Sequence, residues 1–302
     1  MGEPAGIGPD VAVAAFAALK GRAGAHPLRL LGDAQIFRAC GLSDSASVIP
    51  VSAPAGRKAG VPDPANAEAV IACIDEAVRM AMDGEAAAIV TAPINKAVLT
   101  RAGFEYAGHT EYLAHLTGAR RAVMMLAGAG LRVVPLTIHI PLAEVPSHIS
   151  KDAIVETGEI IMAALKRDFG IAKPRLAVAG LNPHAGESGT MGREETAFIV
   201  PAIEALRAKG HDVTGPLSAD TMFHEAARAR YDAALCMYHD QALIPLKTLA
   251  FWEGVNVTLG LPIVRTSPDH GTALDIAGTG KADAKSMIAA IELAAKMADA
   301  RG

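Results

Sequence analysis

The stretch Arg132–Glu187 reads RVVPLTIHIPLAEVPSHISKDAIVETGEIIMAALKRDFGIAKPRLAVAGLNPHAGE and contains two apolar runs with an amphipathic segment between them. Ser150 is a good helix-capping residue, and apolar side chains recur after it at helical spacing until Gly170. The flanking runs, Arg132–Ile140 and Arg175–Leu181, have the composition of buried strands. A strand–helix–strand unit is typical of a parallel sheet, so this stretch predicts an α/β protein.

The same alternation continues on both sides of this unit. Helices are expected at Gly8–Leu19, Ala65–Met82, Glu194–Lys209 and Ala284–Met297, and strands at Leu28–Leu31, Ala87–Thr91, Val123–Ala127 and Ala233–Tyr238. Pro201 is expected to break the third helix, because proline lacks a backbone N–H. No long polar linker separates the elements. A second lobe must therefore be inserted through short crossings, which favours a discontinuous first domain.

The amino-terminal segment MGEPAGIGPD, residues 1–10, is a turn rich in glycine and proline. In α/β proteins such a turn usually follows a strand. Either the fold has no strand at this point, or a first strand of a few residues precedes Met1. We favour the second interpretation.

The composition of the chain disfavours several classes of protein. Of its 302 residues, 51% are hydrophobic and 20% are charged, so the chain can bury a core. A net charge of −4 without a basic run gives no support to a nucleic-acid or anionic-membrane partner. No apolar stretch is long enough to span a bilayer. The three cysteines lie far apart without a CxxC pair, which fits a reducing, cytoplasmic location.

Three histidines follow three different apolar runs. His139 ends VVPLTIH, His184 lies just after RLAVAGL, and His239 ends AALCMYH. Because the carboxyl ends of parallel strands meet at one edge of a sheet, these imidazoles can converge on one point. Three neutral imidazoles suit Zn²⁺ or Co²⁺ and leave coordination positions open for a substrate. The alternative is three unrelated loop histidines. His109 and His270 also lie beside glycines and polar residues and are further candidate site residues.

The chain lacks both the G-x-G-x-x-G dinucleotide motif and a GK[ST] phosphate loop. Its segment His270–Ala282, HGTALDIAGTGKA, resembles instead the adenosine-binding loop of the β-decarboxylating dehydrogenases, the class of isopropylmalate and isocitrate dehydrogenases. Glycines here let the backbone approach a nucleotide closely, and Asp275 can accept a hydrogen bond from a ribose 2′-hydroxyl but repels a 2′-phosphate. We therefore expect NAD as cofactor, with contacts from His270, Gly271, Asp275, Gly278 and Gly280. The alternative is a glycine-rich turn before the last helix.

The motifs GEPAGIGP, TAPINK, AGHTEY, LNPHAGE, GPLSADT, MYHDQ, GVNVTLGLPIVRTSPDHGTALDIAG and GKAD occur in this order along nearly the whole chain. Together they resemble the 4-hydroxythreonine-4-phosphate dehydrogenase family of pyridoxal phosphate (vitamin B6) biosynthesis. The ordered set is specific, although each short motif alone is weak. One departure is Glu3, where the family usually has aspartate.

The resemblance implies a two-lobed α/β/α sandwich of the isopropylmalate dehydrogenase-like type, with largely parallel sheets and an active-site cleft between the lobes. Residues 1–110 with 255–302 are expected to form a discontinuous domain carrying the NAD loop. Residues 111–254 are expected to carry the metal histidines and the dimer contacts. A homodimer with its active site at the subunit interface is implied, acting on a phosphorylated small molecule.

The resemblance also implies particular site residues. A divalent metal (zinc, cobalt or magnesium) is expected on His139, His184 and His239, with one ligand supplied by the partner subunit. Substrate contacts are expected from His109, Thr110, Lys247, Asn256 and Arg265. The implied reaction is NAD-dependent oxidation of 4-phosphooxy-L-threonine to 2-amino-3-oxo-4-phosphooxybutanoate, which decarboxylates to 3-amino-2-oxopropyl phosphate.

Lys247 and Arg265 are interpreted as anchors for phosphate or carboxylate, because an anion in a cleft needs cations. Asp240 is either an acceptor that orients a ligand imidazole or a simple turn acid. Lys96 either reaches the substrate in proton transfer or is a surface lysine that opens a helix. Four further charged residues are expected to cap the following helix, namely Glu187, Arg193, Glu194 and Glu195.

Three rival functions remain at this stage. The first is a paralogous dehydrogenase of 4-phospho-D-threonate or D-erythronate phosphate. The second is a metal-dependent phosphohydrolase, disfavoured because no cluster of extra carboxylates for a two-metal site is evident. The third is a phosphometabolite sensor that binds without turnover.

Overall fold

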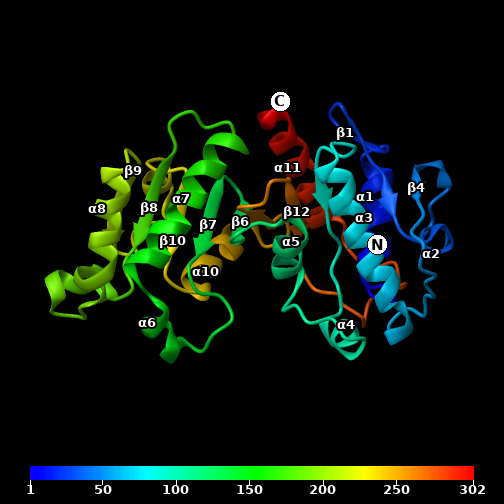
Figure 1. Ribbon diagram of the computed structural model, residues 1–302, viewed down its shortest axis with the longest axis horizontal. Coiled ribbons are helices and arrows are strands. Elements are labelled where there is room, and N and C mark those ends of the chain that lie inside the picture. The colour runs from blue at the N-terminus through cyan, green and yellow to red at the C-terminus, as the bar shows by residue number, and fades with distance from the viewer. The chain divides into compact units, whose positions relative to one another are not determined.

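Figure 1 shows the computed structural model of the chain, which describes residues 1–302. The chain divides into two compact units. Unit 1 consists of Met1–Ala122, Leu261–Ala300 and Gly302, and unit 2 consists of Val123–Gly260 and Arg301. Unit 1 is thus built from two separate stretches of sequence, and the breaks between the units lie somewhat later than residues 110 and 254, where we expected them.

Unit 1 contains most of the helices of the chain and three short strand pairs. Its helices are α1 (Gly8–Ala18), α2 (Ala34–Ala39), α3 (Ala67–Met82), α4 (Lys96–Arg101), α5 (His109–Thr117) and α11 (Lys285–Arg301, whose Arg301 is assigned to unit 2), with 3-10 turns η1 (Ser45–Ser47) and η2 (Pro64–Asn66). Its strands are β1 (Arg22–Ala23), β2 (His26–Pro27), β3 (Leu30–Leu31), β4 (Val48–Ile49), β5 (Ile89–Val90) and β12 (Arg265–Pro268). Strand β1 pairs antiparallel with β2, whereas β3 pairs parallel with β4, and β5 pairs parallel with β12.

Helix α3 illustrates why these residues form these elements. Its buried side chains include Ala67, Val70, Ile74 and Val78, which lie on one face because they recur every three or four residues. They pack in a core cluster with residues of β5 and α5. The helix begins close to the expected residue 65 and ends at the expected residue, Met82.

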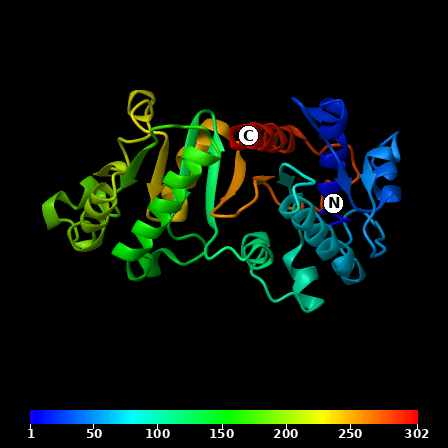
Figure 2. The same cartoon turned by 45° about the horizontal axis from the view of Figure 1, so that its top comes forward.

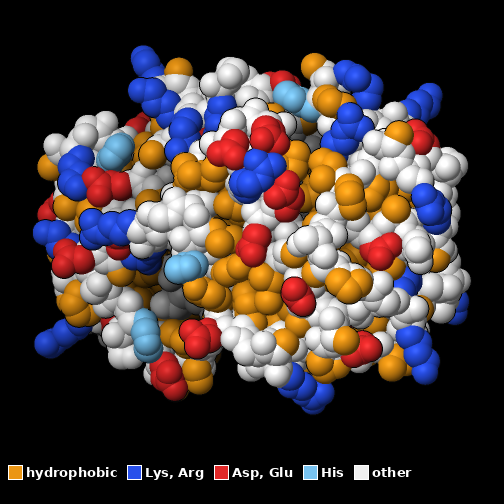
Figure 3. All heavy atoms as spheres, turned by 45° about the vertical axis from the view of Figure 1, so that its right-hand side comes forward, with side chains coloured by type: hydrophobic (Ala, Val, Ile, Leu, Met, Phe, Trp, Pro, Cys, Tyr) orange, Lys and Arg blue, Asp and Glu red, His pale blue; other side chains and the backbone are white.

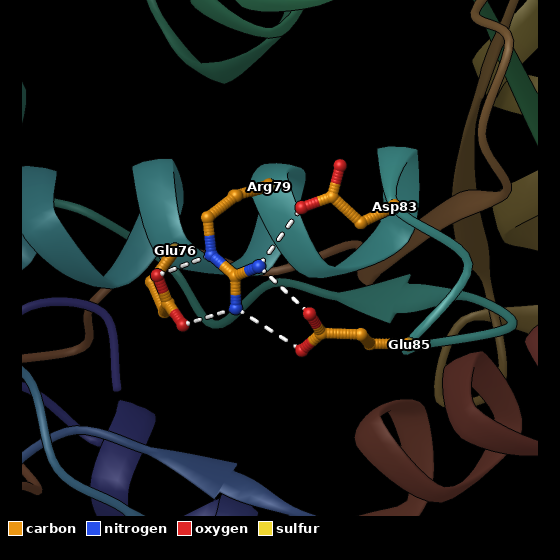
Figure 4. A network of polar contacts seen from close by, with 4 residues as sticks. All are labelled: Glu76, Arg79, Asp83 and Glu85. Atoms are coloured by element: carbon orange, nitrogen blue, oxygen red, sulfur yellow. Dashed lines mark hydrogen bonds and ion pairs between the residues drawn. The ribbon is translucent and has the colours of Figure 1, made fainter.

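The exposed face of α3 carries a network of ion pairs around Arg79 (Figure 4). The guanidinium bonds Glu76, Asp83 and Glu85, with N···O distances of 2.8, 2.9 and 2.8 Å. The network joins the end of the helix to the turn that leads into β5. Since all four side chains face solvent, salt screens these pairs and they add little to stability.

A cavity of about 650 Å³ lies within unit 1. Its lining includes Leu30 and Leu31 of β3 and Ile89 and Val90 of β5, so two short strands border it. Each of these strands has one pairing partner, β4 for β3 and β12 for β5. The cavity is therefore bordered by strands with free backbone edges.

Met1 stands at the carboxyl ends of both bordering strands. A Cβ on Gly32, just after β3, would lie 2.8 Å from the Met1 Cβ. On the other side, Glu3 N donates to the carbonyl of Pro93, just after β5, at 2.9 Å. The first strand that we expect before Met1 would therefore run parallel to β3 and β5 and lie between them. That strand stays a prediction.

Unit 2 is organised around a sheet with the strand order β11-β6-β7-β10-β8-β9. The strands are β6 (Val123–Gly128), β7 (Leu131–Pro135), β8 (Arg175–Ala179), β9 (Asp212–Leu217), β10 (Ala233–Cys236) and β11 (Val255–Leu259). The neighbours from β7 to β9 are all parallel, whereas β6 is antiparallel to both β7 and β11. The prediction of an α/β protein with a largely parallel sheet is confirmed.

Helices cover both faces of this sheet. They are α6 (Val145–His148), α7 (Lys151–Arg167), α8 (Val200–Ala208), α9 (Glu225–Arg228) and α10 (His239–Ala250), with short turns η3 (Leu142–Glu144) and η4 (Pro183–Gly189) and a π-helical turn η5 (Glu195–Ile199). Helix α7 connects β7 to β8, and α8 connects β8 to β9, so both connections run towards the β9 edge of the sheet. Helix α10 connects β10 to β11, so this connection runs towards the opposite edge. Right-handed crossovers therefore place α7 and α8 on one face and α10 on the other, as Figure 2 shows.

Two elements of unit 2 differ from the expected ones. The strand expected at Arg132–Ile140 ends at Pro135, so His139 lies in the following loop. The helix expected at Glu194–Lys209 begins with the π-helical turn and continues as α8 with Pro201 in its first turn. The expected break at Pro201 is therefore wrong: the helix continues through the proline, and the missing N–H is accommodated by the π-helical turn before it.

No helix of the chain is both long and apolar enough to cross a membrane. On the face of the molecule drawn in Figure 3, lysine and arginine side chains are scattered among acidic, polar and apolar ones. They do not gather there into a continuous basic field.

Candidate active site

Two of the predicted metal ligands lie together in unit 2. His139 follows β7 in a loop, and His239 is the first residue of α10, directly after the turn that ends β10. Strands β7 and β10 are parallel neighbours, so the segments after them leave the same edge of the sheet. The two ring centroids are 6.0 Å apart. Two imidazoles on one tetrahedral ion, with metal–nitrogen distances of about 2.0–2.1 Å, have ring centroids roughly 5 Å apart, so this pair is somewhat wider than a shared ion requires.

The orientation of His239 is set by its neighbour. Its Nδ1 lies 2.6 Å from Asp240 Oδ1, so the carboxylate accepts a hydrogen bond from this nitrogen and leaves Nε2 available for a metal. This contact supports the interpretation of Asp240 as an orienting acceptor. Asp240 is itself 68% exposed and therefore has little other packing to satisfy.

His184 lies in an unusual turn after β8. Five consecutive residues, from His184 to Ser188, adopt left-handed backbone angles, with φ between 41° and 76°. Only Gly186 among them adopts this conformation without steric cost. A run of strained residues persists only where the surrounding structure holds it, and such runs cluster at functional sites. The His184 side chain is exposed and so accessible to a ligand.

The structure does not form the complete predicted metal site within one chain. No group of three or more histidine, cysteine, aspartate or glutamate side chains is arranged to hold an ion. The donors nevertheless fit zinc or cobalt, because imidazole nitrogen suits both ions and two of the three imidazoles lie near each other. Convergence of His184 on this pair stays a prediction.

A second candidate cluster lies in unit 1. His109 and Thr110 open helix α5, and both are half-buried. Arg265 is the first residue of β12, is 4% exposed, and donates to Thr91 Oγ1 at 2.6 and 3.2 Å. Burial lowers the pKa of Arg265 to about 10, so the group is still a cation at neutral pH.

The electrostatics of His109 follow from this neighbour. Burial is the main cause that holds the pKa of His109 well below its ordinary value, and the positive charge of Arg265 adds to the effect. His109 is therefore neutral at physiological pH. A neutral imidazole beside a buried guanidinium offers a hydrogen bond and a positive charge to an anionic ligand.

The glycine-rich loop after β12 is also in unit 1. It packs on the amino-terminal turn, because Ile7 N donates to the Thr272 carbonyl at 2.9 Å. Gly278 has a φ of +69°, and a Cβ there would lie 2.9 Å from the Cβ of Ala59, so glycine is required. Asp275 is exposed. Nε2 of His270 is buried without a hydrogen-bond partner, a hydrogen-bonding capacity that a bound ligand would satisfy.

Three further residues were expected in the site, and they lie on three different elements. Asn256 lies on β11, and its buried Oδ1 has no hydrogen-bond partner, which again suits a ligand contact. Lys247 lies half-buried on α10 with its Nζ 5.6 Å from the centroid of the Phe251 ring. Lys96 is exposed at the start of α4, which favours its reading as a surface lysine that opens a helix.

Sequence reasoning missed two roles. Thr91 binds the guanidinium of Arg265, and its presence in the TAPINK motif was the available signal. Glu195 was expected to cap a helix, which is wrong: its buried carboxylate accepts hydrogen bonds from Leu181 N and Asn182 N at 2.8 and 2.7 Å. In the sequence, a glutamate three residues after a glycine resembles a helix cap. Only the fold shows that the Glu195 carboxylate lies beside the residues that follow β8.

Comparison with known proteins identifies the family of the chain. The model of the family described as "Pyridoxal phosphate biosynthetic protein PdxA" matches residues 13–294. A relative from Paracoccus denitrificans named 4-hydroxythreonine-4-phosphate dehydrogenase is 55% identical, with 99% of this chain and 97% of the relative covered. The crystal structure of 4-hydroxythreonine-4-phosphate dehydrogenase from Klebsiella pneumoniae superposes with a TM-score of 0.88 at 41% identity, with 99% and 98% covered. A terephthalate 1,2-cis-dihydrodiol dehydrogenase from Burkholderia xenovorans is more distant, with a TM-score of 0.70 at 29% identity and coverage of 98% and 96%.

A largely parallel sheet with helices on both faces defines an α/β protein, a class in which ligands usually bind at the carboxyl ends of the strands. The match over most of the chain makes the family specific. The chain belongs to the PdxA family of pyridoxal phosphate biosynthetic proteins.

Proposed function

We propose that the chain catalyses the NAD- and metal-dependent oxidation of 4-phosphooxy-L-threonine to 2-amino-3-oxo-4-phosphooxybutanoate, which decarboxylates to 3-amino-2-oxopropyl phosphate. The observation that carries the proposal is the pair His139 and His239, 6.0 Å apart, in a chain of this family. The names of the relatives supply the substrate.

The residues of unit 2 are proposed to hold the metal. His139, His184 and His239 would be its ligands, and Asp240 would fix the tautomer of His239 through the bond to Nδ1. A divalent ion bound there supplies a Lewis acid that acidifies a hydroxyl and polarises a ketone. Zinc and cobalt suit three imidazoles better than magnesium, which prefers oxygen ligands.

The residues of unit 1 are proposed to bind the substrate anion. Arg265 supplies a buried positive charge, and Thr91 holds its guanidinium in place. His109, kept neutral by burial and by this charge, can accept or donate one hydrogen bond without repelling Arg265. Thr110 of unit 1 is proposed as a further substrate contact. Lys247 and Asn256 of unit 2 are also proposed as substrate contacts, with Lys247 as a charge that balances the phosphate.

The loop from His270 to Gly280 is proposed to bind NAD, the hydride acceptor. Asp275 is exposed and would accept a hydrogen bond from the ribose 2′-hydroxyl. The buried Nε2 of His270 lacks a partner and would gain one from the nucleotide. The sharp backbone at Gly278 allows close approach of the cofactor.

A homodimer is proposed as the working form. Helix α10 and the residues after it expose large apolar side chains, namely Ile244, Leu249, Phe251 and Trp252, at 64, 42, 61 and 63%. Phe251 and Trp252 lie in contact, with ring centroids 5.1 Å apart, and large apolar side chains exposed together usually mark an interface. Because α10 also begins with His239 and Asp240, a second copy packed there would lie near the proposed metal ligands. The cytoplasm is the proposed compartment, supported by three free cysteines.

The test is NADH formation by purified protein loaded with zinc or cobalt. We expect turnover with 4-phosphooxy-L-threonine, loss of turnover after chelation, and recovery when metal is returned. Faster turnover of 4-phospho-D-threonate or D-erythronate phosphate would assign the chain to the paralogous dehydrogenase instead. Phosphate release without NADH would support the phosphohydrolase, and binding without turnover would support the sensor.

A further inference from the structure

Three polar side chains are buried at the edge of the unit 2 sheet where the histidines lie. Thr137, Glu195 and Gln241 are 8, 2 and 7% exposed. None of them is a predicted metal ligand or substrate contact. All of them bind backbone groups within four residues of one of the three histidines.

Thr137 joins the segments that carry His139 and His239. Its Oγ1 donates to the Met237 carbonyl at 2.8 Å, and its backbone N–H points to the same oxygen at 3.3 Å. Thr137 is two residues before His139, and Met237 is two residues before His239. The contact therefore fixes the offset between the two segments from which the imidazoles project.

Gln241 joins the His239 segment to the strand that leads to His184. Its Oε1 accepts from Met237 N at 2.6 Å, and its Nε2 donates to the Gly180 carbonyl at 2.7 Å. Because one partner is a donor and the other an acceptor, only one orientation of the amide satisfies both. Both polar groups of Met237, N–H and C=O, are thus held by side chains.

Glu195 holds the turn that carries His184. Its Oε1 accepts from Leu181 N and Asn182 N, and its Oε2 accepts from Asn182 Nδ2 at 2.9 Å. The turn packs directly on the carboxylate, since a Cβ on Gly186 would lie 2.5 Å from Oε2. A charged acceptor of three hydrogen bonds is a strong restraint on the left-handed backbone that follows.

These contacts form one continuous chain. Thr137 binds Met237, Gln241 binds Met237 and Gly180, and Glu195 binds Leu181 and Asn182. If these side chains only satisfied buried backbone groups, their contacts could lie anywhere in unit 2. Instead, the contacts link the His139 segment to the His239 segment, and the His239 segment to the His184 segment. We propose that Thr137, Gln241 and Glu195 are positioning residues that hold in place the segments carrying His139, His239 and His184, and so tune metal affinity without touching the metal, whichever subunit supplies each ligand. This inference rests on the proposed metal site.

The test compares Co²⁺ binding to metal-free wild type and to variants. Thr137→Val and Gln241→Leu each remove the bonds while nearly conserving side-chain size. We expect the Kd for Co²⁺ in calorimetry to rise about 10- to 100-fold, as for other supporting residues of metal sites. The visible absorption band of the bound Co²⁺ should also change, since it reports ligand geometry. Thr137→Val is the milder change and keeps the test decisive where Gln241→Leu does not fold.

Tyr231→Phe is the matched control. Tyr231 is also a buried residue of unit 2, and its hydroxyl donates to a backbone carbonyl, that of Met222, at 2.8 Å. It should lower the melting temperature while leaving Co²⁺ affinity and the absorption band unchanged. Wild-type affinity in the folded Thr137→Val and Gln241→Leu proteins would overturn the inference, as would an equal loss in Tyr231→Phe.

Failure of the metal site itself gives a different result. If wild type binds no Co²⁺, or if His184→Ala binds it as tightly as wild type, the proposed site is wrong and the positioning role falls with it. If His184→Ala loses Co²⁺ while Thr137→Val and Gln241→Leu keep it, only the positioning role is wrong.

Discussion

His109 shows how one residue of unit 1 is adapted to bind an anion without carrying charge itself. Burial and the neighbouring Arg265 hold its pKa well below the ordinary value, so Arg265 provides the positive charge. Two cations side by side would repel each other when the site is empty. A neutral imidazole avoids this repulsion and still offers a hydrogen bond.

The depressed pKa of His109 predicts a specific dependence of stability on pH. Below the pKa of an unfolded histidine, about 6.5, the unfolded state binds a proton that folded His109 does not. The free energy of unfolding should therefore fall as the pH drops through this value, and His109→Gln should lose that part of the dependence. Urea unfolding of both proteins between acid and neutral pH measures the difference. Parallel curves for wild type and variant would contradict the assignment.

Asp275 is predicted to select the cofactor. Asp275→Ala should weaken NAD about 10- to 100-fold, the effect of removing one hydrogen bond to a charged group. The affinity for NADP should fall less or rise, because the repulsion of the 2′-phosphate is also removed. The ratio of kcat/KM for NAD to that for NADP measures both effects, and an unchanged ratio would rule out this role.

At the scale of elements, the cavity between β3 and β5 offers a direct test. An extension of about five alternating valine and isoleucine residues before Met1 should fill it, pair both strand edges, and raise the melting temperature by roughly 5–10 °C. The amino group of Met1 already lies near Cys73, another lining residue, where it opposes the larger effect of burial, which raises the pKa of that thiol. Thermal unfolding of the extended protein measures the gain.

An extension of the same length made of glycine and serine is the control for this experiment. It buries little apolar surface and has low strand propensity, so it should leave the melting temperature unchanged. Equal melting temperatures for the two extended proteins would show that the cavity does not accept a strand.

Elements with long periodic patterns could be predicted from sequence, and short or tertiary ones could not. Helix α7 begins after Ser150, whose Oγ accepts from Ala153 N as its capping pattern indicates. Strand β7 ends at Pro135, earlier than its apolar run, and Thr137 beyond it binds Met237, the residue just after the neighbouring strand β10. Such a contact joins residues 100 positions apart, which periodicity cannot reveal.

The candidate site shows the same division. The rule that strand ends converge predicted that His139 and His239 would lie near each other, and their ring centroids are 6.0 Å apart, whereas their role as metal ligands stays a prediction. The left-handed turn at His184 could not be predicted, because only Gly186 and Gly189 in it favour such angles. It depends on Glu195, whose position is set by the fold rather than by local sequence.

At the scale of the whole molecule, the exposed apolar residues of α10 and of the segment just after it predict self-association. Replacing both Phe251 and Trp252 by aspartate should convert a dimer into a monomer, because each burial of a large side chain is worth about 1.5–3 kcal/mol. Activity should fall with dimer content if the partner completes the site. Sedimentation measures the mass, and Met82→Asp on α3, where the side chain is 48% exposed, is the control. A dimer that survives both substitutions would place the interface elsewhere.

X-ray absorption at the zinc edge tests the central claim that three histidines bind one ion. We predict three imidazole nitrogens at about 2.0–2.1 Å from zinc in the loaded wild type, and two in His184→Ala. A zinc spectrum without imidazole scattering, or one that His184→Ala leaves unchanged, would contradict the account.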